Sequence, residues 1–223
     1  MFELIQRGGF LMWPILIASA VALTIFFERW LFFRRQDLKA EEFLAGIINL
    51  VQRRQYQEAL DRCEEAYGPV AQVVHAAIKH HNLPKSELRE IVQEVAQLQM
   101  PRLEQHLSTL ATLGYLTPLI GLLGTITGMI SVFMTMQAKS GTATAGDLSG
   151  GIWEALLTAA AGLCVAIPTY AAYNFLVTRL NHFMRDMERA GIEIVQALSE
   201  KGVRSEQEIQ KQNREVSLAS SSL

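Results

Sequence analysis

Three long runs of uncharged residues constrain this chain more than any other feature of its sequence. They cover 10–27, 107–138 and 155–178 and are 18, 32 and 24 residues long. An α-helix needs about 20 apolar residues to cross a bilayer. Half of the 223 residues are hydrophobic and 19% are charged. The sequence therefore predicts an all-α membrane protein with three transmembrane helices.

Composition and motif content argue against several other classes of protein. The net charge of −2 gives no sign of a surface that binds nucleic acid. Cys63 lies in a charged stretch and Cys164 in an apolar run, so we expect no disulfide framework. The five histidines lack the spacing of a metal motif, and the glycine-rich GLLGTITG lies inside an apolar run without the lysine of a phosphate-binding loop. We expect a protein that is not an enzyme and has no metal site and no organic cofactor.

Positive charge is distributed unevenly between the segments outside the apolar runs. Eleven of the 20 Lys and Arg residues lie in 28–106 and seven follow Thr178, whereas the N-terminal stub and the 137–150 loop carry one each. Positively charged segments next to membrane helices stay in the cytoplasm. We therefore predict a multi-pass membrane protein with an outside N-terminus, a cytoplasmic C-terminus and a mainly cytoplasmic soluble part.

These patterns divide the chain into eight predicted segments. Stripes of apolar residues at helical spacing in 28–106, broken at Gly68-Pro69 and at 82–84, indicate a small helical bundle into which the long helices extend. Pro101 should kink the last of these helices or mark its boundary. In chain order the segments are a periplasmic stub (1–9), transmembrane helix 1 (10–27), a cytoplasmic helical domain (28–106), transmembrane helix 2 (107–136), a periplasmic loop (137–150), transmembrane helix 3 (151–178), a cytoplasmic helix (179–200) and a disordered tail (201–223).

Glu154 lies at the mouth of the third run, one helical turn before Thr158. A carboxylate that faces lipid costs roughly 2.5 kcal/mol or more, so Glu154 should face a protein interior or a water-filled path. A carboxyl group held in a low dielectric can take up and release protons near neutral pH, while threonine hydroxyls can order water beside it. Position alone leaves a simpler alternative open, in which Glu154 is a first-turn acid that complements the helix dipole.

The second run carries an unusual set of small and hydroxylated residues. Thr117, Gly121 and Thr125 recur every four residues, Gly128 follows on the same side, and Gly124-x-x-x-Gly128 lies within the run. Such a face lets helices approach closely and lets hydroxyls bond across an interface. Close packing without a further role is the alternative for the glycines.

Three stretches of the apolar runs form a recognisable combination: TPLIGLLGTITGMISVF in the second run, GIWEALLTAAAGLCVAIPTYAAYN in the third, and the N-terminal GGFLMWPILIASAVALTIFFERW. Together they resemble the MotA/TolQ/ExbB proton channel family, most closely its ExbB branch. The resemblance extends over about residues 8–200. Three spans with a large segment after the first fit ExbB and TolQ, whereas the flagellar stator MotA has four.

The resemblance implies a homopentamer in the lipid bilayer of a bacterial inner membrane, whose second and third spans line a pore. An ExbD- or TolR-like single-span partner with an intramembrane aspartate would occupy that pore, and a TonB-like protein could receive the force. Protons would be the coupling ion. The implied function is to couple the proton motive force to work on the cell envelope.

The resemblance also assigns roles to individual residues. Glu154 matches the functional glutamate of the family, and Thr125 matches its polar second-span threonine. Ala159 stands where ExbB-type proteins often carry the pore threonine, so Thr158 or Thr127 would have to supply that hydroxyl. The proton pathway is thus predicted to contain Glu154, Thr125 and Thr158. The residues predicted to line the pore or pack the spans are Thr117, Gly121, Gly124, Thr127, Gly128, Ala159 and Gly162.

Three alternative functions remain open at the level of sequence. The hypothesis of a TolQ-like subunit for envelope maintenance differs from the ExbB-like hypothesis only in the envelope partner. An oligomeric scaffold would use the small-residue faces for assembly alone, without proton conduction. A subunit of a secondary transporter is disfavoured, since the three spans show no internal repeat.

Overall fold

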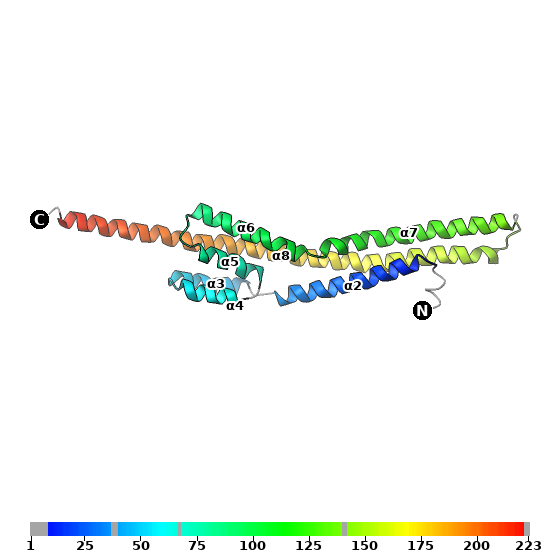
Figure 1. Ribbon diagram of the computed structural model, residues 1–223, viewed down its shortest axis with the longest axis horizontal. Helices are drawn as coiled ribbons and strands as arrows, with labels where there is room; N and C mark the ends of the chain where they lie inside the picture. Colours follow the sequence, from blue (N-terminus) through cyan, green and yellow to red (C-terminus); the bar gives the residue numbers. More distant parts are fainter. Residues whose placement is uncertain (1–8, 37–39, 67, 140–141, 221–223) are drawn as a thin grey trace. The chain divides into compact units, whose positions relative to one another are not determined.

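The computed structural model describes residues 9–36, 40–66, 68–139 and 142–220, with side chains described as far as residue 199. Apart from short turns these residues are helical, and no strand occurs among them. The predicted all-α fold is therefore confirmed. The helices, labelled as in Figure 1, are α2 (Met12–Arg35), α3 (Ala40–Gln52), α4 (Tyr56–Glu65), α5 (Pro69–Lys79), α6 (Lys85–Glu104), α7 (Leu107–Ala138) and α8 (Ala145–Ser220).

Within the described residues, α2, α7 and α8 are each long and apolar enough to cross a membrane. This confirms the three predicted transmembrane helices. Many of their large apolar side chains are exposed, among them Phe133 on α7 and Ile167 on α8. In water such a surface would be unfavourable, whereas in a bilayer it contacts lipid or another membrane helix. The direction in which the helices cross stays a prediction.

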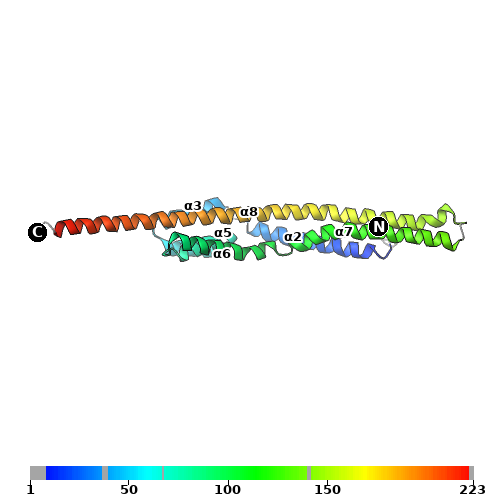
Figure 2. The same cartoon turned by 90° about the horizontal axis from the view of Figure 1, so that it is seen from above.

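The chain forms two compact units, and the membrane-spanning parts of these helices belong to the first. This unit, called the membrane unit below, holds the described residues up to Phe32 together with Glu104–Thr178. In this unit α7 runs alongside the first part of α8 in both ribbon views (Figures 1 and 2). The buried side of α2 repeats every three or four residues, as a helix packed along one face requires. Its apolar members within the span are Met12, Ile15, Ala18, Ala22 and Ile25.

The break before α7 is made by the backbone of one residue. Pro101 lies inside α6, which continues to Glu104. His106 has a φ of 62°, a left-handed conformation that a right-handed helix does not contain, and α7 begins at Leu107. The boundary predicted near Pro101 therefore lies a few residues further on, where His106 interrupts the helix.

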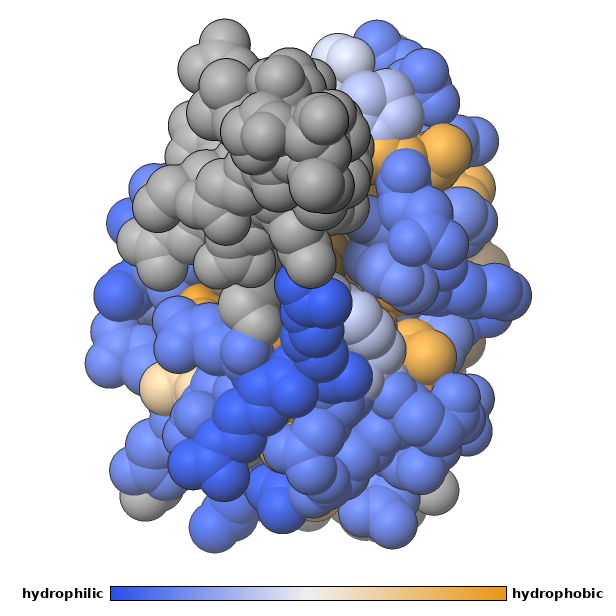
Figure 3. All heavy atoms as spheres, turned by 90° about the vertical axis from the view of Figure 1, so that its left-hand side faces the viewer, coloured by the Kyte–Doolittle hydropathy of each residue, from blue (hydrophilic) through white to orange (hydrophobic). Residues whose placement is uncertain are grey.

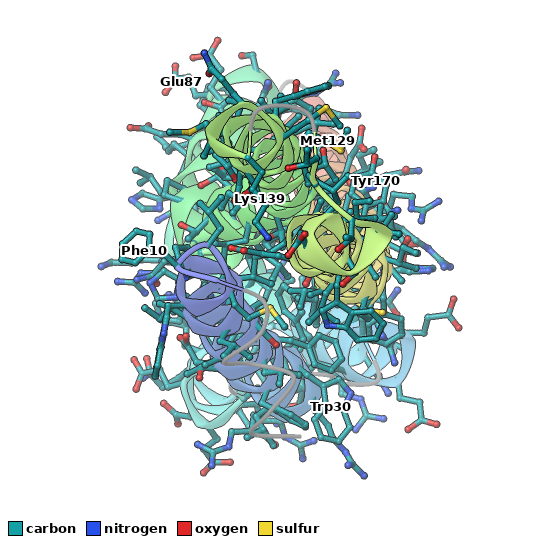
Figure 4. The ribbon with its side chains drawn as sticks, turned by 90° about the vertical axis from the view of Figure 1, so that its right-hand side faces the viewer. Phe10, Trp30, Glu87, Met129, Lys139 and Tyr170 are labelled. Carbon is teal, nitrogen blue, oxygen red and sulfur yellow. The ribbon has the colours of Figure 1, made fainter. Side chains whose placement is uncertain are left out.

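A polar cap joins α7 to α8. The Asp147 carboxylate accepts hydrogen bonds from the backbone N–H of Thr144, at 2.9 Å, and from its hydroxyl, at 2.8 Å, and it forms an ion pair with Lys139. Figure 4 shows Lys139 lying between the ends of α7 and α8. Asp147 is the third residue of α8, the position from which an acidic side chain can bond back to the residue before the helix. Hydrogen bonds from Lys139 and then from Thr144 hold the pKa of Asp147 well below its usual range.

This cap makes a pH-dependent contribution to stability. Because the pKa of Asp147 is lower in the folded protein, its contribution is complete above the unfolded value of about 3.9 and is lost as the pH falls toward the folded value. We expect Asp147→Asn to lower the thermal unfolding midpoint in detergent at pH 7 and to differ progressively less from the wild type below about pH 4. A difference between the two proteins that stays constant from pH 7 to pH 3 would contradict this assignment.

The second compact unit holds the described residues of Phe33–Leu103 and the chain from Arg179 onward. Its core is built from α5, eight of whose eleven residues are buried, and from large apolar side chains of its other helices such as Ile47, Leu88 and Ile194. The face of the molecule seen in Figure 3 is mainly hydrophilic, as expected for a helical domain in water. The buried Cys63 thiol belongs to this unit, and burial raises its pKa to about 12.

Both predicted breaks in this unit are confirmed. Gly68, with a φ of 148°, separates α4 from α5, and Pro69 follows at the first helical turn, where proline is best tolerated. The turn at 80–83 separates α5 from α6, with the N–H of Leu83 bonded to the carbonyl of His80. The far end of the chain differs from expectation, because α8 continues to Ser220 and residues 201–220 are helical where the sequence predicted a disordered tail.

The burial pattern of α8 in the second unit gives a matched pair of variants. Ile194 is fully buried, whereas Ile192, two residues earlier, is 55% exposed. We expect Ile194→Ala to lower the free energy of unfolding by about 2–4 kcal/mol because it leaves a cavity, and Ile192→Ala to have a much smaller effect. Thermal unfolding in detergent measures both. Equal losses would show that the buried face of α8 has been assigned wrongly.

Candidate functional site

The site lies where α7 and α8 pack against each other within the membrane unit. Small residues of α7 recur at alternating steps of three and four, a spacing that keeps one face of a helix toward its neighbour. The glycines allow the backbones of the two helices to come into direct contact. A Cβ atom on Gly121 would be 3.1 Å from the carbonyl oxygen of Thr158, and one on Gly162 would be 2.9 Å from the carbonyl oxygen of Thr117. The small residues of α7 in this seam are Gly114, Thr117, Gly121, Gly124 and Gly128.

The buried threonine hydroxyls of this seam bond within their own helices. Thr117 donates to the carbonyl of Leu113 at 2.5 Å, and Thr158 donates to the carbonyl of Glu154 at 2.6 Å. Both hydroxyls are thereby satisfied without a partner on the other helix, which removes the cost of burying them. The predicted small-residue face is real, but its hydroxyls do not need an interhelical bond to be buried.

Thr158 is fully buried, and its side chain lies against Gly124. A Cβ atom on Gly124 would be only 2.6 Å from the Cβ of Thr158. The structure therefore places Thr158 in the α7–α8 seam of its own chain, where the sequence led us to expect a hydroxyl turned toward a partner in the pore. Ala159, next along the helix, is less buried and approaches Gly121.

The other two predicted hydroxyls lie outside the tightest part of the seam. Thr125 is half-buried and donates to the carbonyl of Leu122 at 2.6 Å. Thr127 is exposed and shares its proton between the carbonyls of Leu123 and Gly124, each at 3.1 Å. Thr125 therefore sits at the edge of the face that the four-residue spacing assigned to it, and Thr127 lies on the open side of α7.

Glu154 is half-buried near the start of the apolar part of α8. The next residue, Ala155, is buried in the seam against Gly128, while the Glu154 carboxylate lies against the backbone of Gly9, just before α2 begins. The side chain is thus held between elements of the membrane unit rather than turned fully to the surrounding medium. The structure brings Glu154 together with Gly9 and ties its carbonyl to Thr158.

A second polar cluster of the membrane unit was not singled out as functional from the sequence. Arg29 is 2% exposed, its guanidinium lies 5.0 Å from the centre of the Phe32 ring, and it pairs with Glu28 at 3.3 Å. His106 Nδ1 lies 3.0 Å from the Glu28 carboxylate and 3.4 Å from Arg29. The Glu-Arg pair directly after the first apolar run was the available clue. The position of His106 beside it could come only from the fold.

Three membrane-length apolar helices, a close small-residue seam and a half-buried carboxylate at one end of it define a multi-span membrane protein with an ionisable group in its helical core. The chain belongs to the MotA/TolQ/ExbB proton channel family, whose model matches residues 65–189. That range includes all of α7 and the apolar part of α8, so Thr125, Thr158 and Glu154 lie within the matched region.

Curated relatives agree with this assignment. An ExbB-like biopolymer transport protein from Synechocystis sp. is 30% identical over 195 residues, covering 84% of this chain and 75% of the relative. The biopolymer transport protein exbB1 of Vibrio cholerae is 28% identical over 193 residues, covering 83% of each chain. The Tol-Pal system protein TolQ of Haemophilus influenzae is 40% identical over 84 residues, covering 38% of this chain and 36% of the relative.

The seam can be tested with a pair of glycine variants. A Cβ atom on Gly128 would lie 2.7 Å from the Cβ of Ala155 and 2.8 Å from the carbonyl oxygen of Gly151, whereas one on Gly150 would meet nothing within 4 Å. We expect Gly128→Ala to force the helices apart and to destabilise the protein by about 1–3 kcal/mol. Gly150→Ala should be neutral or slightly stabilising. Thermal unfolding in detergent compares them, and an unchanged midpoint for Gly128→Ala would refute close contact at this point.

Proposed function

We propose that this chain is a non-enzymatic proton-channel subunit that couples the proton motive force across a bacterial inner membrane to work on the cell envelope. The observation that carries the proposal is the half-buried Glu154 in the membrane unit of a chain that belongs to a proton channel family. Ionisable groups within membrane helices are costly and mark ion or proton pathways by default. Protons are the coupling ion, and no other cofactor is needed.

The energy available per proton is sufficient for mechanical work. One charge that crosses 100 mV releases about 2.3 kcal/mol. A carboxyl group is suited to this role because it can be neutral while it faces apolar surroundings and charged while it faces water. In this proposal Glu154 takes up a proton on the outer side, and the half-buried Thr125 lines the route. Thr158, whose hydroxyl is already bonded within its helix, holds the α7–α8 seam in register beside it.

A single carboxylate near one end of a span does not provide a complete path through about 30 Å of hydrocarbon. We infer that further carboxylates come from a partner, an ExbD- or TolR-like single-span protein with an intramembrane aspartate. Several copies of this chain, five if the resemblance holds, would surround it. The exposed apolar faces of α7 and α8 supply the surface that such an assembly needs. A TonB-like protein would then receive the force.

Similarity to ExbB proteins extends over most of the chain, which favours an ExbB-like role in energising transport. The higher identity to a TolQ protein covers 38% of the chain and supports a TolQ-like role in envelope maintenance as the second candidate. The two differ in the partner that is driven. Restoration of growth in bacteria that lack either system distinguishes them. A scaffold without proton conduction is the third candidate, and it is separated from both by a flux measurement.

The test of the proposal is Glu154→Gln. The amide keeps the size of the side chain but cannot exchange a proton, so we expect normal assembly and a loss of proton-driven activity of at least tenfold. Proton flux into liposomes that contain this chain and its partner provides the measurement. Glu188→Gln, the same change at an exposed position of α8, is the matched control and should behave as the wild type.

Wild-type flux with Glu154→Gln would reject the proposed role of this residue. The absence of flux from the unmodified pair of proteins would favour the scaffold.

A further inference from the structure

The backbone of Gly9 lies directly against the Glu154 carboxylate, so that any side chain at position 9 would meet the carboxylate. Gly9 has a φ of 70°, in the left-handed region that L-residues rarely adopt. A Cβ atom built on it would overlap the nearer Glu154 carboxylate oxygen and would lie 2.7 Å from the carboxyl carbon and 3.3 Å from Cγ. The backbone conformation therefore favours glycine here, and a side chain at this position would displace the flexible end of Glu154.

Both sides of this contact are held by ordinary helical structure. The carbonyl of Gly9 accepts the backbone N–H of Met12 at 3.3 Å, which fixes Gly9 at the entry to α2. Phe10 is 83% exposed and points away from the helices, so it does not compete for the space (Figure 4). Glu154 is held by its neighbour Ala155, which is 4% exposed in the seam against Gly128. The contact thus joins the start of α2 to the start of the apolar part of α8.

We propose that Gly9 is a positioning residue for Glu154. The bare backbone before α2 forms a seat on which the carboxylate rests, and this seat sets how much of the carboxylate is covered at this end of the membrane unit. The consequence for proton uptake rests on the function proposed above, whereas the seat itself does not. A side chain at position 9 pushes the carboxylate off the seat and changes its accessibility.

The direct test measures the accessibility of Glu154 without any need for the partner protein. A hydrophobic carbodiimide reacts with protonated carboxyl groups in apolar surroundings, and mass spectrometry of the full chain in liposomes gives the labelling rate of Glu154. We expect Gly9→Ala to raise this rate at least twofold. Gly9→Asn should have the same effect, because asparagine tolerates a positive φ and therefore adds the Cβ atom with little backbone strain. Gly150→Ala, where a Cβ atom meets nothing within 4 Å, is the matched control.

A double-mutant comparison remains informative if labelling is prevented by poor insertion of the Gly9 variants. Gly9→Asn, which adds the Cβ atom with little backbone strain, should lower the thermal unfolding midpoint of the wild type and should lower that of Glu154→Ala by less, since the displaced side chain is then absent. Equal shifts in the two backgrounds overturn the seat. Unchanged labelling in both Gly9 variants also overturns it.

The outcome of this test is independent of the outcome for the proposed function. If Glu154→Gln retains full flux while the Gly9 variants change the labelling rate, the seat exists and the proton-relay role is rejected. If Glu154→Gln abolishes flux and the Gly9 variants leave labelling unchanged, the relay role stands and the seat is rejected. If both hold, Gly9→Ala should reduce flux, whereas Gly150→Ala should not.

Discussion

The membrane unit depends on the close approach of two backbones, those of α7 and α8. Lipid tails are as apolar as leucine, so helices in a bilayer gain little by burying large apolar side chains against each other. Association must come from dispersion contacts, which become numerous only when small residues let the helices touch. Gly121 and Gly162 approach the carbonyl oxygens of the opposite helix, and Gly124 accommodates the Thr158 side chain. Larger residues at these positions would hold the helices apart.

The same constraint explains how polar groups are accommodated in the seam. The hydroxyls of Thr117, Thr158 and Thr169 are buried, and each bonds to a carbonyl one turn earlier in its own helix. The seam is therefore closely packed, and the hydroxyl groups of these three threonines are hydrogen-bonded within their own helices. Glu154 is the exception, placed near the start of the apolar part of α8, where its carboxylate rests on the backbone of Gly9. The tightly packed seam holds the α8 backbone in place and thereby fixes the position from which the Glu154 side chain extends.

The second unit is stabilised mainly by the burial of large apolar side chains. Its core is made of large apolar residues such as Ile78 and Ile194, because burial from water rewards apolar area directly. Gly68, which has a positive φ, stands directly before α5 and separates it from α4. The chain thus uses glycine in two ways. In both units it lets helices approach closely, as Gly191 does beside Val92, and at Gly68 it marks the boundary between two helices.

The helical class, the three membrane helices and the small-residue face could be predicted from the sequence, since each follows from hydrophobicity, length and spacing along one helix. The sequence also drew attention to Glu154 through the cost of a carboxylate beside an apolar run. The residues that meet across helices could be identified only in the folded chain. The fold placed Thr158 against Gly124, moved Thr125 to the edge of the seam, brought His106 to Glu28 and seated Glu154 on Gly9. Periodicity fixes the direction of a side chain around its own axis, but the rotation of one helix against another depends on all of their contacts together.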